Sequence, residues 1–377
     1  MYFPNAGTDW ERRAPADRGL DPAAVENAIR YHQTTGTPPE DIAYDFSNHD
    51  PWDGDPEGYG EVIGPMPDRR GGPAGVILKD GYLVGEWGDT TRVDHCFSVA
   101  KSFLSIVGGV AYDRELIVDM ADRVADSIDD GGFAGEHNGA ITWQQLFQQT
   151  SEWNGELFGK PDTVDRNRPV GKSPDELGDV GHRDLQEPGT YWEYNDVRIN
   201  RIALCLLRLF GKPLPRVLAH EIMDPIDATR TWEWHGYYNS DVRVDGQRMK
   251  SVSGGGHWGG GVWMSTRDLA RFGHLLLNSG QWDDQRLVSN DWLEMATAPC
   301  SIQPTYGYLF WLNTDGDLWP SAPETSYAAI GHGRNIVWVD PDDDLVVVLR
   351  WLATDDAAEG SLQPTMDAFL SQLLAGV

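Results

Sequence analysis

Cysteine and lysine are both scarce in this chain of 377 residues. The three cysteines are an odd number and form no CxxC pair, which argues against a disulfide framework or a thiolate metal site and fits a reducing cytoplasm. Six lysines are present, and 59 acidic residues outnumber 30 basic ones to give a net charge of -29. A surface this acidic repels nucleic acid and anionic lipid, so we expect neither as a partner.

Signals for a membrane or for secretion are lacking as well. No uncharged apolar run approaches the roughly 20 residues that span a bilayer, so a membrane protein is not expected. The amino terminus has no basic segment followed by an apolar stretch, so no secretion signal is recognised. Together with the few cysteines, this favours a globular protein of the cytoplasm.

The acidic residues are spread over the whole length, as in the segment from Asp340 to Asp344, which is broken only by Pro341. An aspartate-rich, lysine-poor surface is typical of a protein that stays soluble in concentrated salt, where screening removes most of the self-repulsion. We favour this interpretation over a binding role for the acidity. It carries no information about chemistry.

Strand signals lie toward both ends of the chain, and helical signals predominate between them. Residues 75–87 give two strand-like runs joined at Asp80-Gly81, which predicts a hairpin. Helices with long loops are predicted over 113–235, strands return after 250, and one strand is expected over 306–313. This order predicts an α/β (α+β) fold in which an antiparallel sheet, flanked by helices, is built from both chain ends around an inserted all-helical lobe.

The length favours two structural lobes over one small domain. Residues 1–95 are predicted to form an N-terminal wrap and the first part of an α/β lobe. Residues 96–235 are predicted to form a mainly helical lobe, and residues 236–377 the remainder of the α/β lobe.

The strongest chemical signal is Ser98-Val99-Ala100-Lys101. Lys101 is the only charged residue between Cys96 and Tyr112, in a segment that otherwise predicts a helix buried on most sides. Three residues apart on a helix, the serine and lysine share a face, and desolvation favours the neutral amine that can take the hydroxyl proton. We therefore predict Ser98 as a nucleophile and Lys101 as its base. The structural alternative is a capping serine beside a lysine that reaches solvent.

A Ser-x-x-Lys motif that opens a buried helix just after a β-hairpin resembles the serine β-lactamase and penicillin-binding protein superfamily. The chain looks most like its class C branch, which includes family VIII carboxylesterases, D-aminopeptidases and 6-aminohexanoate-dimer hydrolase. The resemblance covers most of the chain from about Gly71 onward. It implies a β-lactamase/transpeptidase-like fold and an acyl-enzyme on Ser98.

The class C branch carries a Tyr-x-Asn element about a hundred residues after the nucleophile. Tyr194-Asn195-Asp196 stands at that place, with aspartate instead of asparagine at the third position. By resemblance Tyr194 would shuttle protons between nucleophile and leaving group, helped by Lys101, and Asp196 would lie at the substrate or oxyanion site. The alternative for Tyr194 is an ordinary packing aromatic.

The third family element, Lys-Thr-Gly or looser forms such as His-x-Gly, lies on a strand beside the nucleophile. Its counterpart here is the stretch His332, Gly333, Arg334 and Asn335, within one residue in either direction. The resemblance implies that a backbone N–H near Arg334 or Asn335 is the second oxyanion donor, beside that of Ser98. The family's lysine is missing, which favours ester or simple amide substrates over β-lactams.

These residues predict a serine hydrolase for a small ester or amide, without metal or organic cofactor. A Ser-His-Asp relay through His257 or His332 is the main rival mechanism. Rival functions are a D-peptidase, a weak β-lactamase, and a catalytically silent relative that binds a peptidoglycan-like or peptide ligand.

Overall fold

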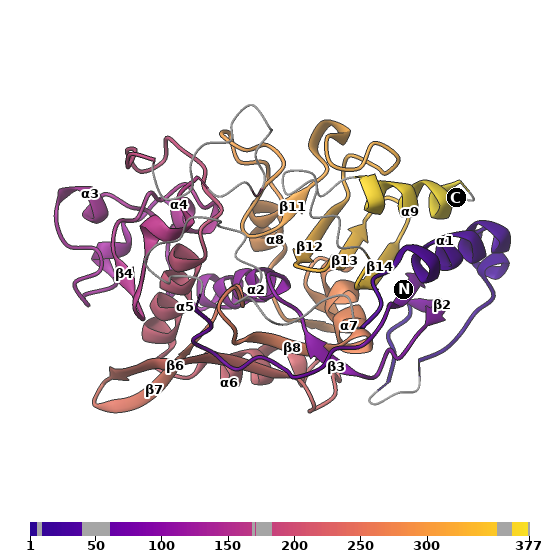
Figure 1. Cartoon of the computed structure of the whole chain (residues 1–377), viewed down its shortest axis with the longest axis horizontal. Helices are drawn as coiled ribbons and strands as arrows, with labels where there is room; N and C mark the ends of the chain where they lie inside the picture. The colour runs from indigo at the N-terminus through magenta and orange to yellow at the C-terminus, as the bar shows by residue number, and fades with distance from the viewer. Residues whose placement is uncertain (6–9, 40–60, 168–169, 171–182, 353–363, 376–377) are drawn as a thin grey trace.

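The computed structural model describes residues 1–5, 10–39, 61–167, 170, 183–352 and 364–375. Strands from both ends of the described chain lie side by side in a six-stranded antiparallel sheet of order β11-β12-β13-β14-β1-β2 (Figure 1). These strands are β1 (Ala74–Lys79), β2 (Tyr82–Trp87), β11 (Trp311–Leu312), β12 (Tyr327–Gly331), β13 (Asn335–Asp340) and β14 (Leu345–Arg350). The sheet confirms the predicted fold class. The predicted turn joins β1 to β2, with both Asp80 and Gly81 at positive φ.

Helices cover both faces of this sheet. Helix α7 (Thr266–Leu277) lies against one face, where Gly273 lets its backbone approach Val337 and Val346. Helices α1 (Pro22–Thr35) and α9 (Pro364–Leu374) pack together against the other face (Figure 1). Every residue of β12, β13 and β14 is buried, which explains the nearly continuous apolar runs of these strands.

A second sheet, of order β3-β8-β6-β7, was only partly predicted. Its strands are β3 (Val93–His95), β6 (Glu233–Val244), β7 (Gln247–Val252) and β8 (Gly261–Ser265). The sequence predicted strands only after residue 250, so β6 and most of β7 correct that prediction. Buried and exposed residues do not alternate along β6, and its pairing with β7 is irregular between Gly236 and Asp241. Most of the strand therefore lacks a period of two, and the signal that was available is the Asp245-Gly246 turn to β7, where both residues have positive φ as at Asp80-Gly81.

The strand predicted over 306–313 was wrong in extent, because only Trp311–Leu312 is a strand. The chain turns just before it, where Leu309 has a φ of 64° and its N–H donates to the Gly307 carbonyl.

The helical region is built on two long buried helices, α2 (Val99–Asp113) and α5 (Asp196–Phe210), which pack together. Asn195 caps α5 by accepting from the Arg198 N–H. Shorter elements are α3 (Glu136–Gly139), α4 (Trp143–Phe147), α6 (Leu214–Leu218), α8 (Asn290–Ala296), β4 (Glu156–Leu157), β5 (Lys160–Pro161), β9 (Gln281–Trp282) and β10 (Gln285–Arg286). The paired strands β4 and β5 show that the inserted lobe is not entirely helical. The predicted lobe boundary at 235/236 falls inside β6.

Among the described residues, three histidines are buried and connect distant segments to the core. His32 Nε2 bonds the Arg350 carbonyl, and His274 Nε2 bonds the Tyr2 carbonyl. His95 Nε2 bonds the Gly260 carbonyl at 2.7 Å. Burial disfavours the charged imidazole and lowers the pKa to about 4 for His32, about 3 for His95 and about 4 for His274.

These histidines are expected to make the stability of the fold decrease from about pH 6.5 downward, before most carboxylates are protonated. A lowered pKa in the folded state means that the unfolded chain binds more protons, so stability is full above pH 6.5 and falls as the pH drops toward 4. With three such groups, the free energy of unfolding falls by up to about 4 kcal/mol per pH unit. Asp340, whose pKa burial raises to about 6, acts in the opposite sense over part of this range.

Urea denaturation at pH 7.5, 6 and 5 measures the effect. His32→Gln should reduce the slope of stability against pH by about 1.4 kcal/mol per unit. His220→Gln, at a ring that is 83% exposed and contacts Glu221, is the surface comparison and should change the slope less than His32→Gln does. Equal stability of the wild type at the three pH values would contradict the expectation.

Candidate active site

Ser98 and Lys101 lie one helical turn apart where α2 begins. Lys101 Nζ donates a hydrogen bond of 2.9 Å to Ser98 Oγ. The lysine is 1% exposed, whereas Ser98 is only partly buried. The amine is therefore shielded from water while the hydroxyl stays accessible to a substrate. This is the contact that the Ser-x-x-Lys spacing predicted.

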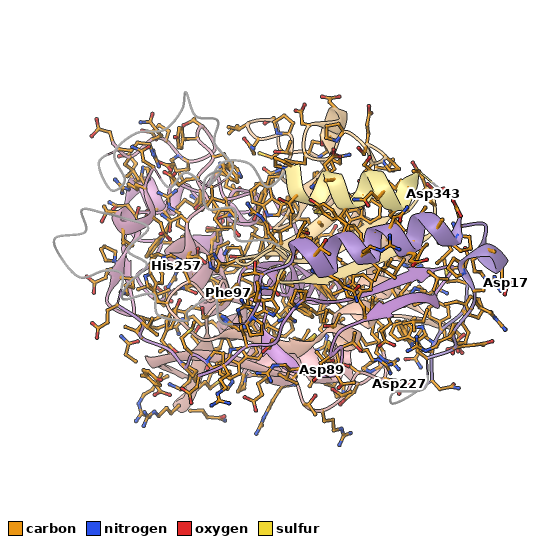
Figure 2. The ribbon with its side chains drawn as sticks, turned by 45° about the vertical axis from the view of Figure 1, so that its right-hand side comes forward. Asp17, Asp89, Phe97, Asp227, His257 and Asp343 are labelled. Atoms are coloured by element: carbon orange, nitrogen blue, oxygen red, sulfur yellow. The ribbon has the colours of Figure 1, made fainter. Side chains whose placement is uncertain are left out.

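A strained residue stands directly before Ser98. Phe97 has a φ of 49°, a left-handed conformation that costs a non-glycine residue about 1 kcal/mol or more. Its buried ring packs on His95, with 4.0 Å between centroids, and on His332, with 5.2 Å. Figure 2 labels Phe97 and His257 in the left half of the molecule, and an added Cβ on Gly256 would lie 3.4 Å from the Phe97 Cα. The bend turns the chain sharply from β3 into α2.

The backbone N–H of Ser98 is available for a ligand. Among the described residues none accepts a hydrogen bond from it, because the first bonds of α2 start at Val99 and Ala100. N–H groups at a helix start carry partial positive charge and stabilise a nearby anion. The position of Ser98 therefore fits an oxyanion donor.

Asp196 binds Lys101, a contact that the sequence did not predict. Its Oδ1 lies 2.7 Å from Lys101 Nζ, and the two side chains are 1% and 2% exposed. The buried ammonium is thus compensated by a carboxylate from the first turn of α5. Gly255 makes room for this pair, because an added Cβ would collide with Asp196 Oδ1 and lie 2.5 Å from Lys101 Nζ. The structure places Asp196 on the lysine side of the site, and its predicted role toward substrate stays a prediction.

Tyr194 lies beside the same amine. Lys101 Nζ is 4.5 Å from the centroid of its ring, which is 4% exposed. The ring stacks on Trp311 with 5.7 Å between centroids and contacts Tyr306 edge to face. Gln149 links these supports, because it donates to Tyr306 Oη and accepts from the N–H of the residue after Tyr194. The fold thus brings together all three residues predicted to be catalytic.

A buried ion network holds the segment that carries Tyr194. Arg183 binds both Glu152 and Glu193, and Arg198 binds Glu152 at 2.7 Å. Burial alone would raise the pKa of Glu152, but its bonds with the two arginines lower it to about 2. No sequence pattern indicated this network, because its partners are far apart in the chain.

The third motif forms the turn between β12 and β13. His332 is exposed, Gly333 is buried, and Arg334 has a φ of 53°. The backbone of Gly331, which precedes them, lies against the Cys96 carbonyl, and an added Cβ there would be 3.2 Å from the Ser98 nitrogen. The turn therefore lies next to the nucleophile, as the resemblance implied. The side chain of Asn335 points into the protein, where it binds the His332 carbonyl and Arg350.

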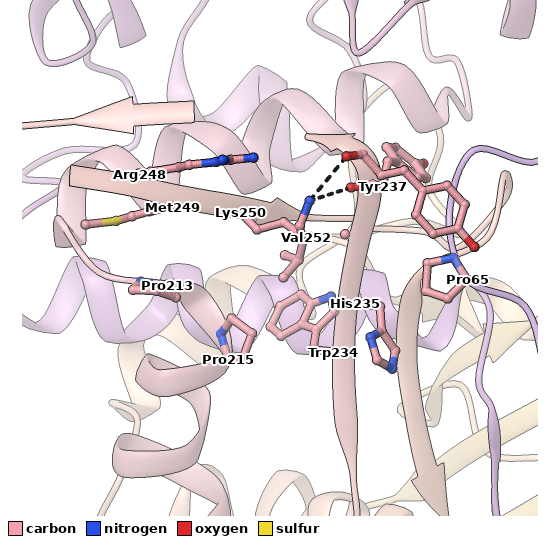
Figure 3. A pocket seen from close by; sticks show the side chains of 12 residues that line it. Pro65, Pro213, Pro215, Trp234, His235, Tyr237, Arg248, Met249, Lys250 and Val252 are labelled. Carbon is pink, nitrogen blue, oxygen red and sulfur yellow. Dashed lines mark hydrogen bonds between the residues drawn. The ribbon is translucent and has the colours of Figure 1, made fainter. Parts of the chain in front are cut away.

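Two other features of the described chain lie outside this group of residues. A pocket of about 440 Å³ is bordered by β6, β7 and the start of α6, with Trp234, Tyr237 and Lys250 among its lining residues (Figure 3). None of the residues predicted as catalytic lines it. No group of three or more potential metal ligands is found in the part of the chain that the structure describes. Nor does that part contain a helix with the length and apolar character needed to cross a membrane.

The sheet, its helices and the serine, lysine and tyrosine brought together beside it define a protein of the β-lactamase/transpeptidase-like class. The family model described as Beta-lactamase matches residues 61–363, and the chain belongs to this family.

The chain is also similar to individual proteins. It is 30% identical over 284 residues to 6-aminohexanoate-dimer hydrolase from Paenarthrobacter ureafaciens, a match that covers 71% of this chain and 62% of that relative's length. The structure resembles that of a family VIII carboxylesterase, with a TM-score of 0.58, 16% identity and coverage of 95% and 98% of the two chains. It also resembles a D-stereospecific amidohydrolase from Streptomyces sp., with a TM-score of 0.55, 16% identity and coverage of 90% and 97%.

Proposed function

We propose that this chain is a serine acyl hydrolase that cleaves an ester or an amide through an acyl-enzyme on Ser98. The observation that carries the proposal is the 2.9 Å hydrogen bond between Ser98 Oγ and the buried amine of Lys101. Lys101 is paired with Asp196 on one side, and on the other it contacts a hydroxyl that stays accessible to a substrate. Membership of the Beta-lactamase family supports the same chemistry.

In the resting state Lys101 is paired with Asp196, and it acts as the base in its deprotonated form. In the first step Ser98 Oγ attacks the substrate carbonyl and gives its proton to this form of Lys101. The C–O or C–N bond to the leaving group then breaks, and Tyr194 supplies the proton that the leaving group takes. Lys101, whose amine lies over the Tyr194 ring, then returns a proton to the Tyr194 hydroxyl. Asp196 stabilises the ammonium form of Lys101 that arises during this cycle.

In the second step water attacks the acyl-enzyme carbonyl. Tyr194 and Lys101 take the water proton and return one to Ser98 Oγ as the acid product leaves. In both steps the oxyanion is stabilised by the Ser98 N–H and by a backbone N–H of the turn at Gly333, Arg334 and Asn335. Each such donor is worth roughly 3 kcal/mol of transition-state stabilisation.

The substrate we propose is a simple ester or a linear amide and not a β-lactam. The β12–β13 turn carries no lysine to bind a penicillin carboxylate, and His332 at its tip is exposed. The names of the relatives point the same way, since they are a dimer hydrolase, a carboxylesterase and an amidohydrolase. We also propose that the protein works in the cytoplasm without nucleic-acid or membrane partners, and that its net charge of -29 is an adaptation to concentrated salt.

A panel of p-nitrophenyl esters, a linear aminohexanoate dimer and a chromogenic cephalosporin tests this proposal, with each assay run in low and in multimolar KCl. Short-chain esters should be hydrolysed fastest, with higher activity in concentrated KCl. Ser98→Ala is the control for background hydrolysis. Turnover of the cephalosporin alone would show that the missing lysine does not exclude β-lactams. Failure of Ser98 to react with a fluorophosphonate would indicate a ligand-binding protein without catalysis.

A further inference from the structure

Arg350, the last residue of β14, is a buried arginine that the proposed mechanism does not use. It is 2% exposed, and within the described part of the chain it forms no ion pair. Burying a charged group without a counter-ion is costly, so its hydrogen bonds have to compensate for the lost hydration. They connect the two sheets of the molecule.

The guanidinium of Arg350 reaches three different strands. Its Nε donates to Asn335 Oδ1 of β13 at 2.6 Å, and one Nη donates to the Met264 carbonyl of β8 at 3.0 Å. The other Nη donates to the carbonyl of His95, the last residue of β3, at 2.9 Å. A contact of 3.6 Å to Cys96 Sγ extends this set. A planar fork with five donors makes such contacts, whereas a lysine ammonium does not.

These bonds end on both sides of the proposed oxyanion site. On one side, the bonded residues His95 and Cys96 are followed in the chain by the strained Phe97 and then by Ser98, whose N–H is the first proposed donor. On the other side, Asn335 accepts from Arg350 through its Oδ1 and donates through its Nδ2 to the His332 carbonyl at 2.6 Å. This second bond fixes the β12–β13 turn. The backbones of the two sides meet where Gly331 lies against the Cys96 carbonyl.

We propose that Arg350 is a positioning residue that sets the spacing of the two backbone donors of the oxyanion site. It acts through the His95 carbonyl on the nucleophile side and through Asn335 on the turn side. The inference rests on the proposed acyl-enzyme function and adds to it a residue that touches neither substrate nor the reacting atoms. Because an oxyanion forms only in the transition state, disturbing this spacing should slow the reaction without weakening substrate binding.

Arg350→Lys and Arg350→Met are the variants to measure, with Asn335→Ala as a second way to break the same connection. For a p-nitrophenyl ester, each should lower kcat by about 100- to 1,000-fold and change KM by no more than about threefold. Affinity for a boronic acid, which mimics the tetrahedral intermediate, should fall in parallel with kcat/KM. Since Arg350 acts on the turn through Asn335, Arg350→Lys/Asn335→Ala should be little worse than Arg350→Lys alone.

Arg271→Lys is the matched control. Arg271 is also buried, at 1% exposure, and its fork also binds backbone carbonyls, those of Ile226, Pro4 and Asn5, away from Ser98. A purely structural role of Arg350 predicts that both lysine variants lose thermal stability and that neither loses kcat. Our inference predicts a loss of kcat in Arg350→Lys alone.

The outcomes separate this inference from the proposed function. If the wild type reacts with a fluorophosphonate at Ser98, and both Arg350→Lys and Asn335→Ala keep the wild-type kcat, the positioning role is wrong and the hydrolase stands. If the wild type neither reacts nor hydrolyses an ester, both proposals fall. If Arg350→Met does not fold, the other two variants decide the question.

Discussion

Ser98→Ala is expected to abolish ester hydrolysis and leave the fold intact. Loss of a nucleophile typically costs about four to six orders of magnitude in kcat. The substitution removes one acceptor of Lys101, but the amine keeps its bond to Asp196. We therefore expect the free energy of unfolding to change by no more than about 1 kcal/mol. Steady-state kinetics and urea denaturation of the same preparation measure both quantities.

Ser102→Ala is the control for this experiment. Ser102 lies on the same helix, is 1% exposed, and donates to the Leu309 carbonyl. Its loss should reduce stability by about 1 kcal/mol and leave kcat within a few-fold of the wild type. Comparable activity of wild type and Ser98→Ala would remove Ser98 from the mechanism, whatever its contact with Lys101.

Lys101→Met is expected to lose both activity and stability. The substitution removes the proposed base and leaves the Asp196 carboxylate buried without its counter-ion. Removing one partner of a buried ion pair typically costs about 3 to 5 kcal/mol, because the other charge stays desolvated. Urea denaturation should show a loss of this size, and ester hydrolysis should fall to background.

The double variant Lys101→Met/Asp196→Asn separates the two effects. With the carboxylate neutralised, most of the lost stability should return, whereas activity should stay at background. Asp196→Asn alone keeps an acceptor for the amine and should be less destabilised than Lys101→Met. A double variant no more stable than Lys101→Met would contradict the view that Asp196 compensates the charge of Lys101.

Local contacts could be predicted from the sequence. The hairpin of β1 and β2 follows from Asp80-Gly81, because both turn residues tolerate positive φ. The contact of Ser98 with Lys101 follows from helical spacing, since residues three apart share a face. The apolar runs of β12 to β14, together with the β1–β2 hairpin, indicated strands toward both ends of the chain and so predicted one sheet built from both.

Contacts across long sequence separations could not be predicted. Lys101 and Asp196 are 95 residues apart, and nothing local shows that the amine has a carboxylate partner. A buried lysine needs compensation, so an acidic residue at the start of the apolar helix α5 was the available signal. Arg350 follows the apolar run of β14 in the sequence, but its burial became known only from the structure. The strained φ of Phe97 left no trace in the sequence.

The most direct test is the mass of a covalent intermediate. The protein is mixed with a fluorophosphonate or a slowly hydrolysed ester, the intact mass is measured, and the modified peptide is sequenced. We predict a single adduct, on Ser98, that is absent from Ser98→Ala and forms much more slowly in Lys101→Met. Ester turnover with no adduct on Ser98, or an adduct on another residue that persists in Ser98→Ala, would contradict the acyl-enzyme.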